Sequence, residues 1–353
     1  MSDTVVVIGG GPGGLRAAAG IAEIGVPVVL LEQAEFLGGT PIRENYAGLT
    51  PHGEPAEPMM NRMAEAVTSN PLAEVRLNTR PTGLEGEAGS FRLAVEGPDG
   101  SSTIDCASIV VATGFQHFDP GRETQSYGYY EFEDVICLQD LEAMLKVHEV
   151  RRPSNGEPPK RLCFVQCVGS RDRHIGNEYC SKVCCGVASK EAIEVRELEP
   201  DCKVFIFYID MRMYGYWENE IYWKAQEKHR VQYVKGVISE VLRKGDKLIV
   251  RGEDTTMGRP MELEMDMVVL SVGMEPSLGT RDATRVLSIA PNRFGFIEAV
   301  GAPLDPVSTS RAGIFACGAA LGPADLEDTV SSAANAAMKA ASFALGRATA
   351  AAG

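Results

Sequence analysis

The sequence predicts an α/β protein of two paired domains, on three observations. Short and continuously apolar runs, such as residues 4–8, recur along the chain and end in glycine, as strands of a buried parallel sheet do. Segments with the composition of helices follow several of these runs. The length of 353 residues allows two or three domains. We therefore expect paired Rossmann-like domains, with the second domain inserted into the first.

Composition and charge exclude several classes of protein. No apolar run approaches the roughly 18 residues of a membrane helix, so we expect no membrane insertion. The first apolar run is too short for a signal peptide, which predicts a cytoplasmic protein. The net charge is −14 with no basic block, so a nucleic acid is not an expected partner. Nine cysteines in a reducing compartment argue against a disulfide framework.

The N-terminal segment carries a dinucleotide-binding fingerprint. An expected strand over residues 4–8 leads into a glycine-rich loop, and an alanine-rich helix is expected over about residues 15–24. A second strand, residues 26–31, ends at Glu32. An ordinary glycine turn is the alternative, but the flanking strands, helix and acid together favour a nucleotide site. The expected cofactor-binding residues of the loop are Gly9, Gly10, Gly11, Pro12, Gly13 and Gly14.

Each part of this fingerprint has a physical task. Gly9 permits the tight turn, and Gly11 lets the backbone approach a pyrophosphate. Gly14 allows close packing of the helix on the strand, while the helix N-terminus supplies N–H donors to the anion. Glu32 is placed to accept hydrogen bonds from the ribose hydroxyls.

Three later segments favour FAD over NAD. Residues 108–111 form an apolar run that ends in Ala112-Thr113-Gly114, and residues 313–318 form another that a small-residue helix follows, over about 329–345. Both segments, with the loop at Gly38-Gly39-Thr40, resemble those of two-dinucleotide-binding flavoproteins of the thioredoxin-reductase-like type. That family usually has Asp after the glycine of the second run, where this chain has Ala319. The resemblance implies FAD contacts from Gln33, Gly39, Thr40, Pro81, Thr113, Gly114, Gly318, Ala319 and Thr329.

The domain organisation follows from these segments. We expect a discontinuous FAD-binding domain over residues 1–118 and 285–353, and a degenerate second Rossmann-like domain over residues 119–284. Within the second domain the pattern predicts strands at 161–166, 203–209 and 268–272, a helix at 181–197, and an antiparallel meander over 231–267.

The second domain lacks the glycine motif of a nicotinamide-binding relative. The expected strand at 161–166 is followed by Cys167-Val168-Gly169-Ser170-Arg171-Asp172, in which only Gly169 remains. Close approach to a pyrophosphate is therefore compromised, and NAD(P)H binding in the usual mode is not expected.

Four cysteines stand in place of that motif. Cys167, Cys180, Cys184 and Cys185 form a C-x12-C-x3-C-C pattern, and clustered thiolates in a reducing compartment indicate a metal or an iron–sulfur cluster. Structural zinc sites prefer two separated C-x2–4-C pairs, whereas adjacent cysteines can reach different irons of a cubane. Zinc, a redox-active disulfide and inert buried thiols are the alternatives. The other five are expected core residues: Cys106, Cys137, Cys163, Cys202 and Cys317.

Four stretches of the sequence resemble one family. QCVGSRD, YCSKVCC, YIDMRMYG and the segment GAALGPADLEDTV over residues 318–330 resemble the A-type component of heterodisulfide reductase. Members from methanogens carry ferredoxin-type C-x2-C-x2-C inserts that this sequence lacks. It is similar to the short form found in sulfur-oxidising, heterodisulfide-reductase-like complexes.

The resemblance implies one FAD and one [4Fe–4S] cluster on the four cysteines Cys167, Cys180, Cys184 and Cys185. It also implies a homodimer within a complex of B- and C-type subunits, and a lipoate-carrying protein as a partner. The functional hypothesis is an oxidoreductase, an electron-transfer component that relays electrons between a partner's sulfur chemistry and its flavin in cytoplasmic sulfur oxidation. The alternatives are a stand-alone NAD(P)H-dependent disulfide or quinone reductase, and a non-catalytic assembly component. No catalytic residue is assigned.

Overall fold

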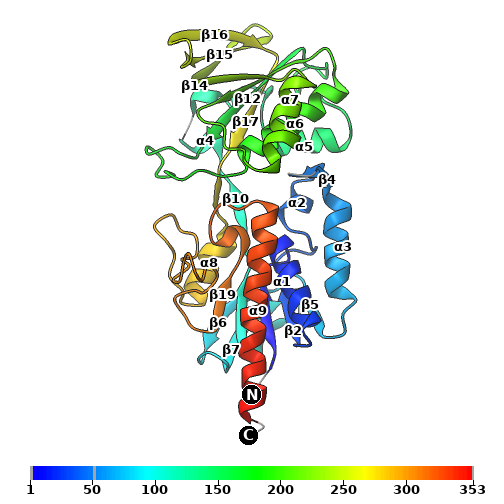
Figure 1. Ribbon diagram of the computed structural model, residues 1–353, viewed down its shortest axis with the longest axis vertical. Coiled ribbons are helices and arrows are strands. Elements are labelled where there is room, and N and C mark those ends of the chain that lie inside the picture. The colour runs from blue at the N-terminus through cyan, green and yellow to red at the C-terminus, as the bar shows by residue number, and fades with distance from the viewer. Residues whose placement is uncertain (1–2, 51–52, 124, 352–353) are drawn as a thin grey trace. The chain divides into compact units, whose positions relative to one another are not determined.

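The computed structural model describes residues 3–50, 53–123 and 125–351, which form two compact units (Figure 1). Unit 1 consists of the N-terminal segment up to Arg43, residues Glu57–Gln116 and the C-terminal segment from Glu275. Unit 2 consists of Glu44–Ala56 and His117–Met274. The ends of the expected FAD-binding domain, residues 1–2 and 352–353, lie outside the described residues, as do residues 51–52 and 124.

The division into units differs from the expected domain bounds in three segments, residues 44–56, 117–118 and 275–284. Residues 275–284 lie in unit 1, because the Thr280 hydroxyl bonds to the Thr113 hydroxyl at 2.7 Å and Ala283 packs in the core of that unit. Residues 44–56 lie in unit 2, because the Glu142 carboxylate accepts the Ala47 N–H at 2.9 Å. Neither contact is visible in local sequence.

Unit 1 is built on a five-stranded sheet of order β19-β9-β1-β2-β5, in which every pairing is parallel. A three-stranded antiparallel sheet, β6-β7-β8, belongs to the same unit. Its strands are β1 (Val5–Ile8), β2 (Val28–Leu31), β5 (Ala73–Arg76), β6 (Arg80–Glu85), β7 (Phe91–Gly97), β8 (Gly100–Cys106), β9 (Ser108–Val111) and β19 (Ile314–Ala316). Its helices are α1 (Pro12–Glu23), α2 (Thr40–Arg43), α3 (Ala56–Thr68), α8 (Leu278–Val286), the 3-10 turn η3 (Gly318–Ala320) and α9 (Leu326–Ala351).

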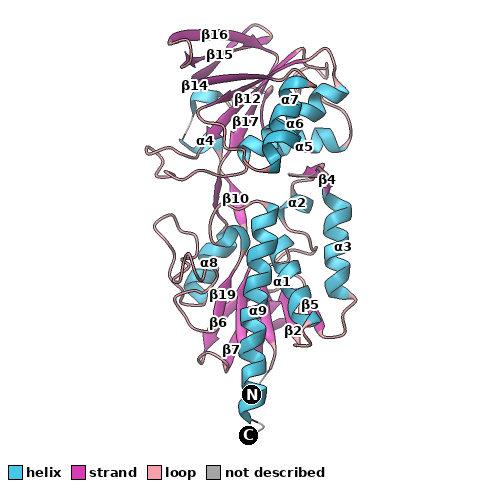
Figure 2. Ribbon diagram, in the orientation of Figure 1, coloured by secondary structure: helices cyan, strands magenta, loops and turns pink. Residues whose placement is uncertain are grey.

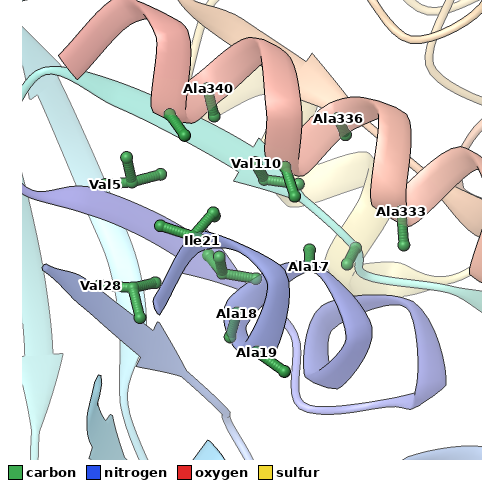
Figure 3. Close-up of a cluster of buried hydrophobic side chains, with 14 of the residues drawn as sticks. Val5, Ala17, Ala18, Ala19, Ile21, Val28, Val110, Ala333, Ala336 and Ala340 are labelled. Atoms are coloured by element: carbon green, nitrogen blue, oxygen red, sulfur yellow. The ribbon is translucent and has the colours of Figure 1, made fainter. Parts of the chain in front are cut away.

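Small side chains bring the first and last helices of unit 1 together. Ala17 on α1 and Ala333, Ala336 and Ala340 on α9 belong to one buried cluster with Val110 of β9 (Figure 3). Alanine lets helix backbones approach closely while it still removes apolar surface from water. The C-terminal helix is longer than the sequence predicted, yet no helix within the described ranges is both long and apolar enough to cross a membrane.

Unit 2 is built on a seven-stranded sheet of order β11-β17-β12-β13-β14-β15-β16. The pairings from β11 to β14 are parallel, and β14, β15 and β16 form the expected antiparallel meander. Its strands are β3 (Gly48–Leu49), β4 (Glu54–Pro55), β11 (Val135–Cys137), β12 (Arg161–Val168), β13 (Lys203–Tyr208), β14 (Gln232–Lys244), β15 (Lys247–Asp254), β16 (Arg259–Met265) and β17 (Met267–Val272). Its helices are α4 (Pro120–Glu123), η1 (Gln125–Tyr127), α5 (Leu138–Lys146), α6 (Cys184–Leu198), the π-helix η2 (Glu218–Trp223) and α7 (Lys224–Glu227).

The central strands of unit 2 separate two buried clusters. Leu162 and Phe164 of β12 pack with residues of α5 and α6, and Figure 2 shows these helices on one side of the strands. Cys163 and Val165 pack in a second cluster on the opposite face. Two short strands, β10 (Phe115–His117) and β18 (Met274–Pro276), pair where the chain passes between the units.

We expect Gly14→Ala to destabilise unit 1. A Cβ at Gly14 would lie 1.7 Å from the Gly9 carbonyl oxygen, and backbone atoms at the turn cannot move aside without breaking the packing of helix on strand. Overpacking of this kind costs about 1–3 kcal/mol or more. Gly20→Ala is the matched control in the same helix, because its Cβ would meet the Ala337 Cβ at an ordinary 3.5 Å. The thermal unfolding midpoint checks both variants, and an unchanged midpoint for Gly14→Ala would contradict the packing role.

Candidate functional site

The glycine-rich loop of unit 1 presents the N–H groups of a helix start. Helix α1 begins with Gly11 as its N-cap and Pro12 in its first turn, and no side chain of the described residues caps it. Gly9 has φ +109°, and a Cβ there would lie 2.4 Å from the Ala112 carbonyl oxygen, so only glycine fits the turn. The first-turn N–H groups of α1, with the positive end of the helix dipole, therefore suit an anion.

Three later segments converge on this loop within unit 1. A Cβ at Gly39 would lie 2.7 Å from the Gly11 Cα. A Cβ at Gly13 would lie 3.3 Å from the Thr329 Cγ2 and 3.5 Å from the Cys317 Sγ, and one at Gly318 would lie 2.9 Å from the same Thr329 methyl. The structure thus brings the start of α1, the loop before α2, the 3-10 turn η3 and the first turn of α9 to one place. Ala319 lies buried in that 3-10 turn.

Glu32 lies beside the loop, at the end of β2. One carboxylate oxygen accepts the Gly10 N–H at 2.6 Å, and the other accepts the Ala34 N–H at 2.8 Å. The acid thus stands next to the glycine loop, with its carboxylate oriented by two backbone donors; the ribose contact stays a prediction. Gln33, its neighbour, is exposed.

The expected residues Pro81 and Thr40 lie at the borders of this region. Pro81 lies in β6 at a register shift, and the chain just before this strand is held to Glu32, whose carbonyl accepts the Thr79 N–H at 2.9 Å. Thr40 begins α2 and accepts a hydrogen bond from the Arg43 guanidinium at 3.1 Å. These contacts are structural, so a role of either residue in binding stays a prediction.

Thr113 and Gly114, after β9, are held by residues that the sequence analysis did not single out. The Ser277 hydroxyl donates to the Thr113 carbonyl at 2.9 Å, and the Thr280 hydroxyl donates to the Gly114 carbonyl at 3.1 Å. Ser277 also caps α8, since its hydroxyl accepts the Thr280 N–H. A Ser directly before a helical pattern is an N-cap signal that could have predicted this helix start.

In unit 2, Cys167 has an unusual backbone conformation. It lies near the end of β12 with φ +65°, at a register shift between Val165 and Val168. A bulge of this kind re-aims a side chain that a regular strand would hold on the other face. Arg171 and Lys182 also have positive φ, at 58° and 64°. Such non-glycine residues persist only where the surrounding structure holds them, and they gather at functional sites.

Three of the four predicted ligand cysteines are in contact. Cys184 and Cys185 occupy the first turn of α6, as predicted, and both are buried. The pKa of Cys184 lies well below its ordinary value, because the thiols of Cys167 and then Cys185 donate hydrogen bonds to its sulfur. The same contacts, with burial, raise the pKa of Cys167 and of Cys185. The sulfur atoms of Cys167 and Cys185 thus both lie next to that of Cys184.

Cys180 lies in the same segment and is half-buried. Its sulfur accepts the Lys182 N–H at 3.3 Å, and its charge contributes to the raised pKa of Cys167. The positive charge of the Arg171 guanidinium acts to lower the pKa of Cys167. The same guanidinium donates a hydrogen bond to the Asp210 carboxylate at 2.7 Å. Across the described ranges, no three or more His, Cys, Asp and Glu side chains form a group that could hold a metal ion.

The one glycine that remains of the second motif has a packing role. Gly169 has φ +74°, and a Cβ there would lie 2.1 Å from the Phe118 ring. The aromatic ring therefore lies against the backbone at the position where a nucleotide-binding motif would have its glycine turn. The loss of the usual mode of NAD(P)H binding stays a prediction.

The other five cysteines are confirmed as buried residues: Cys106, Cys137, Cys163, Cys202 and Cys317. Burial raises the pKa of the thiol to about 12 at Cys106, Cys202 and Cys317. Neutral thiols at ordinary pH are poor metal ligands and nucleophiles, so these residues contribute packing.

Comparison with known proteins agrees with these features. The sequence profile of the family described as Pyridine nucleotide-disulphide oxidoreductase matches residues 3–341. The chain is 38% identical over 244 residues to the A component of the H(2):CoB-CoM heterodisulfide,ferredoxin reductase of Methanothermobacter thermautotrophicus, which is 67% of this chain and 37% of that protein. It is 39% identical over 244 residues to the second iron-sulfur A component of the CoB--CoM heterodisulfide reductase of Methanopyrus kandleri, with the same coverage of both chains. The matches thus span little more than a third of these relatives' length.

Solved structures give the fold. The chain resembles the thioredoxin reductase of T. acidophilum with a TM-score of 0.65 and 17% identity, covering 97% of this chain and 98% of the other. It resembles that of Lactococcus lactis with a TM-score of 0.64 and 20% identity, covering 97% and 99%. The prediction of paired Rossmann-like domains of the two-dinucleotide-binding type is confirmed.

Proposed function

Because the chain belongs to the pyridine nucleotide-disulphide oxidoreductase family, we propose that this oxidoreductase is an FAD- and [4Fe–4S]-containing electron-transfer component of a heterodisulfide-reductase-like complex. The observation that carries the proposal is the cysteine segment of unit 2. Three thiols meet around Cys184, in the domain where the family's second nucleotide motif is missing and Gly169 packs on Phe118. Relatives named as iron-sulfur components of heterodisulfide reductase support the same assignment.

The residues of unit 1 fit FAD. The first-turn N–H groups of α1 suit a pyrophosphate. Gly11 leaves room for one, because a Cβ added at Gly11 would have the Gly39 Cα, 3.7 Å away, as its nearest neighbour. Glu32 would bind the ribose. Thr113, which follows β9, and Thr329, in the first turn of α9, lie in the two later segments expected to contact FAD. When bound, a flavin exchanges two electrons with an organic donor or one electron with a metal centre.

The residues of unit 2 fit an iron–sulfur cluster better than a single metal ion. The donor set is four thiols, of which Cys184 has a lowered pKa, and the first-turn N–H groups of α6 stabilise negative charge there. A cubane offers a separate iron to each cysteine, so its ligands need not converge on one point as those of zinc must. We propose Cys167, Cys180, Cys184 and Cys185 as the four ligands.

The wider setting follows from the family resemblance. We propose that this chain is the short form of the A-type component in a cytoplasmic sulfur-oxidising complex. Two copies of the chain would form a homodimer, and B- and C-type subunits would bind to it. A lipoate-carrying protein would supply or receive the sulfur substrate. The chain's own contribution to electron transfer is to hold the two redox groups in separate folded units.

A stand-alone NAD(P)H-dependent reductase is the second candidate, because the description of the matching family names pyridine nucleotide and disulphide as its reactants. It requires a nicotinamide site in unit 2. The two candidates separate in one assay, since only the second expects rapid bleaching of the flavin by NADH or NADPH alone.

The proposal is tested by the metal and flavin content of protein purified without oxygen. We expect about one FAD, four iron and four acid-labile sulfide per chain, with no zinc. Flavin absorption should persist when NADH or NADPH is added without partner proteins. Flavin accompanied by zinc, or by no metal, would overturn the proposal and favour thiol–disulfide chemistry.

A further inference from the structure

Three buried polar side chains of unit 2 have polar atoms that no hydrogen bond among the described residues satisfies. Gln166, Ser170 and Ser271 are 7%, 2% and 0% exposed. Within the described part of the chain, neither the amide nitrogen nor the amide oxygen of Gln166 has a hydrogen-bonding partner, and the hydroxyls of Ser170 and Ser271 have none either. A buried polar group left in this state costs about 1–3 kcal/mol. Four such atoms in one place indicate that something else satisfies them.

The three residues lie at the carboxyl ends of two neighbouring strands. β12 and β17 pair in parallel, with Val165 opposite Leu270 and Val168 opposite Val272. Gln166 and Ser271 therefore lie at the same level of the sheet. Ser170 lies just beyond, where its N–H donates to the Cys167 carbonyl at 3.1 Å. In parallel α/β sheets this end of the central strands is where ligands bind.

Gln166 and Ser271 lie on the face of the sheet that α6 covers. Phe164 of β12 and Val269 of β17 pack with Ala188 and Ala192 of α6 in one cluster. Since side chains alternate along a strand, Ser271 lies on the same face as Val269, and Gln166 on the same face as Phe164. The first turn of α6 carries Cys184 and Cys185 at this end.

Cys167 connects these groups to the thiol cluster. It follows Gln166 directly, and the bulge at β12 brings its thiol to Cys184. Ser170 is held against the end of β17, since its Cβ lies 3.1 Å from the position of a Cβ on Gly273. The unpartnered groups and the contacting thiols thus share one strand end, and the amide and the two hydroxyls offer four donor hydrogens.

We propose that Gln166, Ser170 and Ser271 donate hydrogen bonds toward the sulfur atoms of the cysteine-bound cluster and raise its reduction potential. The proposal rests on the proposed function. Hydrogen bonds to cluster sulfur and the polarity of the surroundings set the potential of such centres. Donors stabilise the reduced cluster more than the oxidised one, because reduction adds a negative charge without changing the donors.

The test is a redox titration of the full chain, purified without oxygen and monitored by electron paramagnetic resonance. Gln166→Leu removes both amide donors at similar size, and Ser271→Ala removes one hydroxyl with little change in volume. Cys163→Ala is the control, because Cys163 lies in the same strand on the opposite face. For Gln166→Leu we expect the reduction equilibrium to shift about tenfold against the reduced cluster, which is about 59 mV toward lower potential. Ser271→Ala should shift it in the same direction by less, and Cys163→Ala should not shift it.

The outcomes separate this inference from the function on which it rests. Full iron content with unchanged midpoint potentials in both Gln166→Leu and Ser271→Ala would overturn the inference, assign the polar groups to buried water and leave the proposed function standing. If the unaltered protein holds no iron and sulfide, both are overturned. If Gln166→Leu fails to fold or to retain iron, the more conservative Ser271→Ala decides the matter through its midpoint potential.

Discussion

The Cys184→Ala variant is expected to lose its iron and acid-labile sulfide, or to retain only a converted cluster, while it keeps a full complement of flavin. Cys184 is the thiol that Cys167 and Cys185 both contact, and their hydrogen bonds to its sulfur lower its pKa. Thiolate is the form that binds iron. The residues proposed to bind flavin lie in unit 1, which has its own buried core. Iron, sulfide and flavin assays on anaerobically purified protein measure the outcome.

Cys202→Ala is the matched control for this variant. Cys202 is a buried thiol of the same unit, and burial raises its pKa to about 12, so its loss should leave the iron content unchanged. Full iron in Cys184→Ala would exclude the four-cysteine assignment. Loss of iron from both variants would show that removing any buried thiol from unit 2 disrupts the unit. That result would not support a ligand role for Cys184.

The second large effect is expected at the flavin site, where Gly11→Glu should abolish FAD binding without unfolding unit 1. Gly11 has φ −78° and ψ −174°, which any residue adopts, and an added Cβ would meet only the Gly39 Cα, at 3.7 Å. A carboxylate at the start of α1 satisfies the helix dipole in the free protein. The same carboxylate occupies the approach of the pyrophosphate and repels it. The affinity for FAD should fall at least about tenfold, which corresponds to about 1.4 kcal/mol of binding free energy, and the flavin content of the purified protein should fall with it.

Gly11→Ala provides the control, because its methyl group fits the loop and carries no charge. Absorption at the flavin bands and the thermal unfolding midpoint of the apoprotein should be measured for both variants. Retention of flavin by Gly11→Glu would refute the placement of the pyrophosphate at this helix. A lowered midpoint in the apoprotein would attribute the loss of flavin to unfolding of unit 1, and would contradict the expected stability.

Much of the fold was predictable because its signals are local. The run of β-branched residues before Gly9, the glycine spacing and the acid at Glu32 lie within one stretch of chain, and each constrains its neighbours sterically. The positions of β1, α1, β2 and β9 followed from them within a few residues. The meander of unit 2 followed from alternation and turn residues in the same way.

The domain division was less accessible to sequence. Residues 275–284 belong with unit 1 because Thr280 bonds to Thr113, and residues 44–56 belong with unit 2 because Glu142 and Lys190 hold them. These partners are separated by about 95 to 167 positions in the chain. Periodicity and composition describe a residue's own neighbours, so they carry no record of such contacts.

By itself, the sequence determined that this chain carries a dinucleotide fingerprint, that its second fingerprint is missing, and that four cysteines replace it. Only the tertiary structure decided how those cysteines lie, through the bulge that brings Cys167 to the first turn of α6. It also decided that Gly169 serves the Phe118 ring and that, among the described residues, Gln166 and Ser271 end unpartnered at one edge of the sheet. The physical reason is that spacing along the chain fixes which residue types are near in sequence. Strand pairing and helix packing fix which side chains share a buried volume.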